Sequence, residues 1–223
     1  VFSHDFGARR DGKGLLSDIA GHLPDSFGYV LFDYYDSDAS GSYIQMKSFT
    51  EQLHRLETVI AWVRARQDVK TVHIIAHALG CAVVAKLAPV SIETMQLLAP
   101  STALGDEFDR YSDLAGGKEI AGIRKIQRAD GVTINIPSSF LRELKQIDCE
   151  HDLLKLADVT NYLIVLPSHD EVMNDADYTD LIVLPSVHAT SIDDTNHTFE
   201  GMGRAKLLTY ICQYLTDPTF ANT

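Results

Sequence analysis

The sequence predicts an α/β fold in which a mostly parallel six-stranded sheet is flanked by helices. Short apolar runs alternate with amphipathic stretches over the first half of the chain, which is typical of β-α-β units and parallel sheets. Each apolar run has the length of a strand and is bounded by polar or turn-forming residues. We expect six strands, at Val1–His4, Tyr29–Tyr34, Thr71–Ala76, Glu93–Leu98, Asn161–Leu166 and Asp180–Leu184.

Helices are predicted between these strands, where apolar residues recur every three or four positions. The clearest stripe runs from Phe49 to Val63, and Ser48 with Glu51 forms the S-x-x-E capping box that starts such a helix. We expect this helix and three others to cover the sheet. The other three stripes lie at Leu15–Leu23, Leu79–Leu87 and Leu208–Leu215.

The segment 101–159 interrupts this alternation and predicts a cap. Two short runs, Ile120–Ile126 and Val132–Ile136, flank an Asp130-Gly131 turn, and an Asp-Gly pair between such runs favours a β-hairpin. The segment separates the fourth predicted strand from the fifth, so we expect it above the carboxyl ends of the strands, where α/β proteins bind ligands. We divide the single domain into core residues 1–100, cap residues 101–159 and core residues 160–223.

Charge and composition restrict the partners and the location of the protein. Among 223 residues, 19 Lys and Arg against 31 Asp and Glu give a formal charge of −12, which repels nucleic acid and anionic membranes. No apolar run approaches the ~20 residues of a membrane span. The 3 cysteines show no C-x-x-C spacing, so we expect a cytoplasmic protein without a disulfide framework or structural zinc. The chain starts at Val1 without an initiator Met, so a removed signal peptide, and with it secretion, stays open.

The segment 72–81, VHIIAHALGC, combines a predicted strand, a tight turn and the start of a helix. Ala76 and Gly80 flank the turn, which fits a nucleophile elbow, where bulky neighbours would clash with backbone. Ala78 stands at the nucleophile position. Because alanine has no nucleophilic atom, the chain cannot form an acyl-enzyme there by the usual route. Cys81 lies three positions further, on the predicted helix, and is better interpreted as a buried small hydrophobe than as a substitute nucleophile.

This elbow resembles the G-H-S-x-G motif of the α/β-hydrolase superfamily, and the resemblance extends over nearly the whole chain. The sequence His4-Asp5-Phe6-Gly7 looks like the H-G-F-G oxyanion loop of that superfamily. The resemblance implies an oxyanion hole made of the backbone N–H groups of Phe6 and Leu79. Asp5 replaces a glycine of the loop, and since Asp tolerates left-handed backbone angles we expect the loop to form. Small feruloyl or cinnamoyl esterases and dienelactone-hydrolase-like enzymes are the most similar members.

The same resemblance implies the acid and the base of a catalytic triad. Asp170, after the fifth predicted strand, stands at the acid position, and His197, in N-H-T-F ahead of the last helix, stands at the base position. Asp170 would fix the tautomer of His197, and His197 would take the proton of the nucleophile. The rival base is His188, and the rival acids are Glu171, Asp175 and Asp177.

The remaining side chains of interest are expected to have structural roles and not to bind a metal. His77, beside the elbow, is expected to pack or to hydrogen-bond, and Trp62 is expected to be partly exposed on its helix. The 9 histidines show neither H-E-x-x-H nor another recognised ligand spacing, so we expect no metal. The resemblance implies no organic cofactor.

The resemblance implies a serine hydrolase that cleaves a small carboxylic ester through an acyl-enzyme, with Ser at position 78 in its active form. We favour an engineered replacement that silences the enzyme over a natural loss as the origin of Ala78. Amide or C–C bond hydrolysis by the same triad stays open. The second hypothesis is a non-catalytic ligand-binding protein on the same scaffold, with a natural alanine. The expected partner is a small molecule, and the oligomeric state is not predicted.

Overall fold

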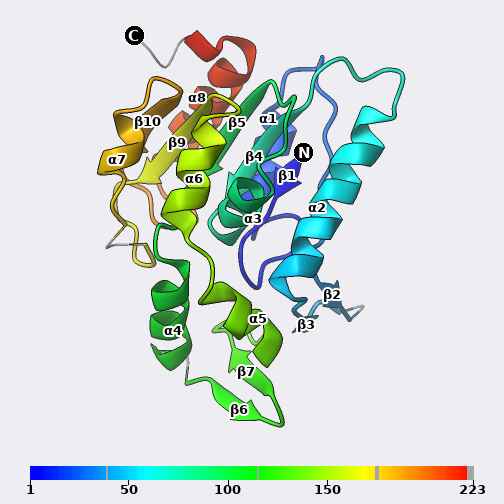
Figure 1. Ribbon diagram of the computed structural model, residues 1–223, viewed down its shortest axis with the longest axis vertical. Coiled ribbons are helices and arrows are strands. Elements are labelled where there is room, and N and C mark those ends of the chain that lie inside the picture. The colour runs from blue at the N-terminus through cyan, green and yellow to red at the C-terminus, as the bar shows by residue number, and fades with distance from the viewer. Residues whose placement is uncertain (39, 115, 174–175, 220–223) are drawn as a thin grey trace.

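Five parallel strands form the central sheet of the computed structural model, which describes residues 1–223 apart from 39, 115, 174–175 and 220–223 (Figure 1). The spatial order is β1-β4-β5-β9-β10, and each neighbouring pair is parallel. These five strands are β1 (Phe2–Ser3), β4 (His73–His77), β5 (Thr94–Leu98), β9 (Tyr162–Pro167) and β10 (Val187–Ile192).

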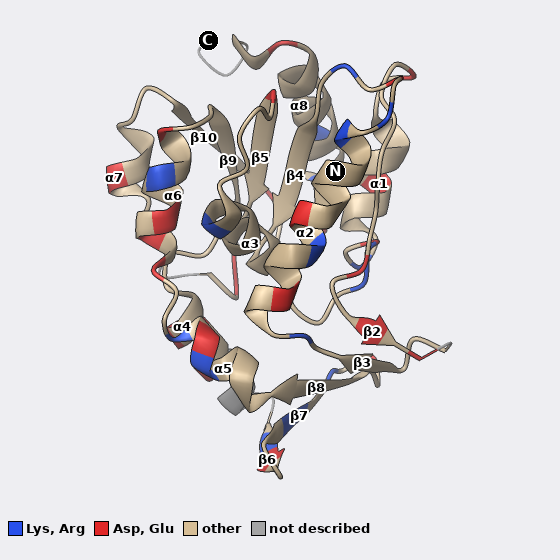
Figure 2. Ribbon diagram, turned by 45° about the vertical axis from the view of Figure 1, so that its right-hand side comes forward, with Lys and Arg blue, Asp and Glu red and all other residues tan. Residues whose placement is uncertain are grey.

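The central sheet separates two hydrophobic cores. In β4, Ile74 and Ala76 belong to one core and Ile75 to the other, as the two-residue period of a strand requires. Because both faces are covered, β4, β5 and β9 are largely apolar, which explains why the sequence located these three strands, whereas β10 mixes polar with apolar residues and was not located. The central strands contain no Lys, Arg, Asp or Glu, and Figure 2 shows charged residues on helices, on loops and on strands outside the central sheet.

Helices pack on both faces of this sheet (Figure 1). One face is covered by α2 (Phe49–Arg64), α3 (Leu79–Leu87) and α6 (Cys149–Ala157), and the other by α1 (Leu15–His22) and α8 (Arg204–Thr216). Four of these helices were predicted.

The predicted start of α2 is confirmed in detail. Ser48 accepts a hydrogen bond from the backbone N–H of Glu51 at 3.1 Å, and the Glu51 carboxylate accepts one from the backbone N–H of Ser48 at 3.1 Å. These two bonds satisfy backbone donors that the first helical turn leaves unpaired. Trp62, further along α2, is 55% exposed, as expected.

Two of the six predicted strands are wrong. In Tyr29–Tyr34 only Leu31 bridges to Phe2, and the backbone N–H of Tyr34 donates to Nε2 of His4 at 3.0 Å instead of to a neighbouring strand. The run Asp180–Leu184 contains helix α7 (Thr179–Ile182), and the last strand, β10, begins at Val187. A short apolar run cannot distinguish a strand from a helical turn by its periodicity, which explains the second error.

The predicted hairpin is confirmed, and it belongs to a second, mixed sheet that was not predicted. β7 (Ile123–Gln127) pairs antiparallel with β8 (Thr133–Pro137) around the Asp-Gly turn. The run Ile120–Ile126 is not one strand, because a turn at Ala121 and Gly122, both with positive φ, separates β6 (Lys118–Ile120) from β7.

Residues from the first part of the chain complete the second sheet. β3 (Tyr43–Gln45) pairs parallel with β8, and β2 (Asp36–Ser37) pairs with β3, so the spatial order is β2-β3-β8-β7-β6 (Figure 2). Helices α4 (Leu104–Leu114) and α5 (Ser138–Leu144) flank the hairpin in sequence. The segment 101–159 is therefore joined by strand pairing to β3.

A close backbone approach at Gly80 gives a stability prediction. A Cβ atom at Gly80 would lie 2.4 Å from the carbonyl oxygen of Ser3, which β1 holds in place. We expect Gly80→Ala to lower the free energy of unfolding by about 1–3 kcal/mol, because the backbone of β1 or α3 must shift. Urea unfolding followed by circular dichroism measures the change. Gly21→Ala is the matched control, since its added Cβ meets nothing within 4 Å in α1, and an equal loss in both variants would contradict the explanation.

Candidate active site

A strained turn connects β4 to α3 and places Ala78 at its tip. The backbone angles of Ala78 are φ 47° and ψ −114°, which a side chain with a Cβ adopts at a cost of roughly 1–3 kcal/mol. The N–H of Ala78 donates to the carbonyl of Leu98 at 3.0 Å, so β5 holds the turn. Ala76 and Gly80 flank it as predicted, and both are buried. The backbone therefore has the local geometry expected of a nucleophile elbow.

The loop after β1 lies beside this elbow. Nδ1 of His4 donates to the carbonyl of Asp5 at 2.9 Å while its Nε2 accepts from Tyr34, so the neutral imidazole is fixed in one tautomer. Burial lowers the pKa of His4, in agreement with a neutral ring. Gly7 has φ 58°, and a Cβ there would lie 2.4 Å from Cδ1 of Ile134 in β8. The second sheet therefore packs directly against this loop.

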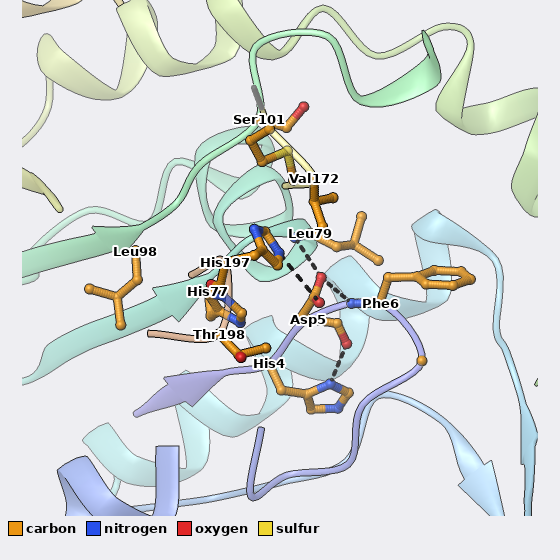
Figure 3. A network of polar contacts seen from close by, with 12 residues as sticks. His4, Asp5, Phe6, His77, Leu79, Leu98, Ser101, Val172, His197 and Thr198 are labelled. Atoms are coloured by element: carbon orange, nitrogen blue, oxygen red, sulfur yellow. Dashed lines mark hydrogen bonds and ion pairs between the residues drawn. The ribbon is translucent and has the colours of Figure 1, made fainter. Parts of the chain in front are cut away.

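The two expected oxyanion-hole donors converge on one atom, and that atom belongs to the protein. Oδ1 of Asp5 accepts hydrogen bonds from the backbone N–H of Phe6 at 2.5 Å and from that of Leu79 at 3.3 Å (Figure 3). We expected Asp5 to matter through left-handed backbone angles, but it is not among the described residues with positive φ. The side chain of Asp5, not its backbone, is what distinguishes this loop.

The structure also brings Asp170 and His197 together. Nδ1 of His197 lies 3.0 Å from each carboxylate oxygen of Asp170, and Oδ1 of Asp170 also accepts from the N–H groups of Val172 at 2.9 Å and Met173 at 2.7 Å. The side chain of His197 is 5% exposed and that of Asp170 10%. The opposite ring nitrogen, Nε2, lies 3.9 Å from Oδ2 of Asp5. His197 therefore lies between two carboxylates, and Figure 3 shows the one that belongs to Asp5.

The rival acids and the rival base do not occupy these positions. Glu171 accepts from the backbone N–H of His197 at 3.0 Å, and Asp177 accepts from the N–H and hydroxyl of Thr179. Asp175 lies outside the described residues. His188 lies within β10, where its ring contacts Tyr214 of α8.

The two remaining candidates near the elbow have structural contacts. Nε2 of buried His77 donates to the carbonyl of His197 at 2.9 Å, and burial lowers the pKa of His77 to about 4. The expectation that His77 forms a hydrogen bond is therefore confirmed. Cys81 is fully buried, burial raises its pKa well above the usual range, and its thiol faces the carbonyl of Leu98. Cys81 behaves as the predicted small hydrophobe.

Opposing effects determine the charges of Asp5, Asp170 and His197. Burial disfavours the imidazolium of His197, but the hydrogen bond to Asp170 and the ion pair with Asp5 raise its pKa to about 10. Burial would raise the pKa of Asp5, but His197 and the charge of Lys13 hold it well below the usual range. At neutral pH both carboxylates are ionised and His197 is a cation.

The raised pKa of His197 makes stability fall in alkaline solution. A group whose pKa is higher in the folded state stabilises the protein fully below its unfolded pKa of about 6.5 and loses that contribution up to its folded pKa. We expect this contribution to the free energy of unfolding to decline between about pH 6.5 and about pH 10. NMR titration of the imidazole measures the pKa. Asp170→Asn is expected to lower it, and an unchanged value in that variant would contradict the assignment of the shift.

A cavity of about 100 Å³ opens onto Asp5 and His197. Its other polar groups are exposed Lys13 and buried Glu107, whose pKa is raised by burial and whose carboxylate accepts from the hydroxyl of Ser101. Sequence reasoning missed both, because they lie on segments without a motif. The apolar lining consists of Phe6, Leu79, Leu104, Phe108, Val172 and Met173.

Two kinds of feature are not found in the described part of the chain. None of its helices combines the length and the apolar character needed to cross a membrane. No three of its His, Cys, Asp or Glu side chains are arranged to hold a metal ion.

Known proteins are similar to this chain in structure, not in sequence. No protein-family model and no curated protein matches it. Est1E from Butyrivibrio proteoclasticus superposes with a TM-score of 0.65 at 13% identity, over 97% of this chain and 86% of that one. A second structure of Est1E, with ferulic acid bound, gives a TM-score of 0.67 at 14% identity, over 97% and 87%. The monoacylglycerol lipase of Paleococcus ferrophilus superposes with a TM-score of 0.69 at 13% identity, over 96% of this chain and 92% of that one.

These likenesses show that the chain has the α/β-hydrolase fold. The predicted fold is thereby confirmed, with a central sheet of five strands instead of six and with a second mixed sheet. Esterases and a lipase match about equally well, so the likeness does not select the feruloyl esterases among them.

Proposed function

We propose that this site is the reaction centre of a carboxylic ester hydrolase in which position 78 is the place of the nucleophile. One observation carries the proposal: the Asp170–His197 pair and the N–H groups of Phe6 and Leu79 converge on a common point beside the elbow. A nucleophile, a base oriented by a carboxylate and two oxyanion donors are the groups that acyl transfer requires. Of these groups the nucleophile is missing, because residue 78 is alanine, and the two donors are present but occupied by Oδ1 of Asp5.

With Ser at position 78, each group would have a defined role. His197 would take the proton of the serine hydroxyl, and Asp170 would hold the imidazole in its tautomer. The backbone N–H groups of Phe6 and Leu79 would stabilise the tetrahedral oxyanion once Oδ1 of Asp5 no longer accepts from them. The cavity of about 100 Å³ and its apolar lining favour a small ester. The ferulic acid bound to structurally similar Est1E is consistent with a small-molecule ligand.

The test replaces Ala78 and Asp5, the two residues that prevent ester hydrolysis in this chain. We expect Ala78→Ser/Asp5→Gly to hydrolyse p-nitrophenyl acetate and butyrate and to react with a fluorophosphonate probe, because the serine and the oxyanion hole are then both available. Adding His197→Ala should abolish turnover. A double variant that is folded, as judged by circular dichroism, yet neither turns over nor labels would refute the proposal. A p-nitroanilide substrate in the same assay tests amide hydrolysis.

A second candidate is a ligand-binding protein without catalysis, and the carboxylate of Asp5 in the oxyanion hole favours it. This chain lacks a serine at position 78, and Oδ1 of Asp5 occupies both donors of the oxyanion hole. If this candidate is right, ferulate or a small ester should raise the Tm of the unaltered protein without being consumed. An unchanged Tm with these ligands would count against it.

A further inference from the structure

The two oxygens of the Asp5 carboxylate have different environments. Oδ1 accepts from the N–H groups of Phe6 and Leu79, whereas Oδ2 lies 3.9 Å from Nε2 of His197, beyond hydrogen-bonding distance. The side chain is 14% exposed and lines the cavity. Oδ2 is therefore ion-paired with His197 without accepting a hydrogen bond from it, which leaves its electron pairs available for reaction.

Ester hydrolysis gives this carboxylate no role other than to obstruct. A single replacement of a catalytic serine by alanine would have left the oxyanion hole open, but Asp5 is a second departure that fills it. Ala78 and Asp5 both differ from the α/β-hydrolase motifs, and both lie at the oxyanion hole. Two such differences at one place favour an enzyme with a different reaction over an enzyme that was inactivated. This interpretation differs from our expectation of an engineered alanine.

We propose that Asp5 is itself a nucleophile, whose Oδ2 displaces an anionic leaving group from a saturated carbon of a short alkyl electrophile, such as an alkyl halide. Carboxylates form covalent intermediates in this way when they are positioned and ionised. The reaction needs no serine at position 78, so it is independent of the proposed ester hydrolysis.

The surroundings of the cavity fit such a substrate. Leu104 and Phe108 are apolar and suit a short alkyl chain, and Lys13, a residue of the same cavity lining, carries a positive charge that favours a departing anion. Ala78 has no side-chain atom beyond Cβ, so no hydroxyl competes with Asp5 for the substrate.

In the first step, an electron pair on Oδ2 forms a bond to the alkyl carbon while the bond between that carbon and the halide breaks. The halide leaves with the bonding electrons, and Asp5 becomes a neutral alkyl ester. Its carbonyl oxygen is Oδ1, which already accepts from the N–H groups of Phe6 and Leu79. The oxyanion hole is therefore placed for the next step before the reaction begins.

In the second step, water attacks Cγ of Asp5. Nε2 of His197 takes one proton from the water, and the negative charge that develops on Oδ1 is stabilised by the two N–H donors. Collapse of the tetrahedral intermediate breaks the bond between Cγ and the alkylated oxygen, and His197 returns the proton to the departing alkoxide. The acid of Asp5 then loses a proton to solvent. The net reaction is alkyl halide plus water to alcohol, halide and a proton.

The first step also prepares His197 for the second. The groups that face its ring are the carboxylates of Asp5 and Asp170 and the ring of His77, which burial keeps neutral. Alkylation of Asp5 removes one of the two negative charges that favour the imidazolium, so the pKa of His197 falls. A proton then leaves for solvent, and the neutral imidazole can act as a base toward water.

The test traps the alkyl ester. His197→Gln keeps a side chain of similar size but cannot act as the base, so incubation with 1-iodobutane should increase the intact mass by one butyl group, which tandem mass spectrometry should assign to Asp5. Hydroxylamine should remove this group, because it cleaves an ester but not an alkylated thiol or imidazole. Asp5→Asn/His197→Gln should remain unlabelled at position 5.

The matched control is Asp180→Asn in the His197→Gln background, which removes an exposed carboxylate outside the site and should leave the labelling unchanged. The unaltered protein should release iodide from 1-iodobutane at least about tenfold faster than Asp5→Asn. Folded His197→Gln without a hydroxylamine-sensitive butyl group on Asp5 would overturn the proposal, whatever the outcome of the ester assays.

Discussion

Ala78→Ser alone is expected to hydrolyse p-nitrophenyl acetate at least about 10²-fold more slowly than Ala78→Ser/Asp5→Gly. In the single variant a serine is present, but the N–H groups of Phe6 and Leu79 still donate to Oδ1 of Asp5. Loss of one oxyanion donor typically costs about 10²–10³ in kcat, and here both are occupied. Initial rates, normalised by fluorophosphonate titration of the serine, measure the ratio.

Asp5→Asn/Ala78→Ser distinguishes an occupied hole from an unfavourable charge. Asparagine keeps a side-chain oxygen that can accept from the same two N–H groups, but it removes the negative charge. We expect this variant to stay slow, close to Ala78→Ser alone. Equal kcat in the single variant and in the variant with Asp5→Gly would contradict the assigned role of Asp5.

The second large effect concerns stability. We expect His197→Ala to lower the free energy of unfolding by about 3 kcal/mol or more, because breaking a buried ion pair leaves a charge without compensation. Asp5, with 14% of its side chain exposed, would lose its cation, and Asp170 would lose its hydrogen bond to the ring. Urea unfolding near pH 7 measures the loss.

Two comparisons separate the ion pair from simple truncation. His188→Ala removes a half-buried imidazole that packs on Tyr214 without an acidic partner in its described contacts, and we expect a smaller loss. Asp5→Asn/His197→Ala should recover part of the loss, since no charge is then left unpaired at position 5. If His197→Ala cost no more than His188→Ala, the electrostatic account of the cluster would be wrong.

The central sheet could be predicted where strands are buried on both faces. β9 is a continuous apolar run, β4 and β5 are buried and largely apolar, and the sequence located each of the three to within two residues. The segment Tyr29–Tyr34 looks the same in sequence, but its backbone bonds to the side chain of His4, a contact between residues thirty positions apart that no local pattern contains. The parallel pairing of β3 with β8 is likewise non-local, so a hairpin was predicted where the structure has a five-stranded sheet.

The sequence predicted which residues form the site, but it did not predict the hydrogen bonds that Asp5 makes there in the folded chain. Ordered motifs gave Ala78, Asp170 and His197, and the structure places the last two in hydrogen-bonding contact. The departure at Asp5 was visible in the sequence, but it was interpreted through backbone conformation. The direction of its side chain depends on N–H groups from two separate loops, which only the folded chain brings together.

Incubation of the unaltered protein with 1-iodobutane in ¹⁸O-labelled water tests most directly whether Asp5 is the reacting group of this chain. If water attacks Cγ of an alkyl ester, the first turnover transfers an oxygen of Asp5 to butanol and leaves ¹⁸O in the carboxylate. We predict that tandem mass spectrometry will find ¹⁸O in the peptide that contains Asp5. Unlabelled Asp5 after incubation, with or without ¹⁸O in the butanol, would contradict the account.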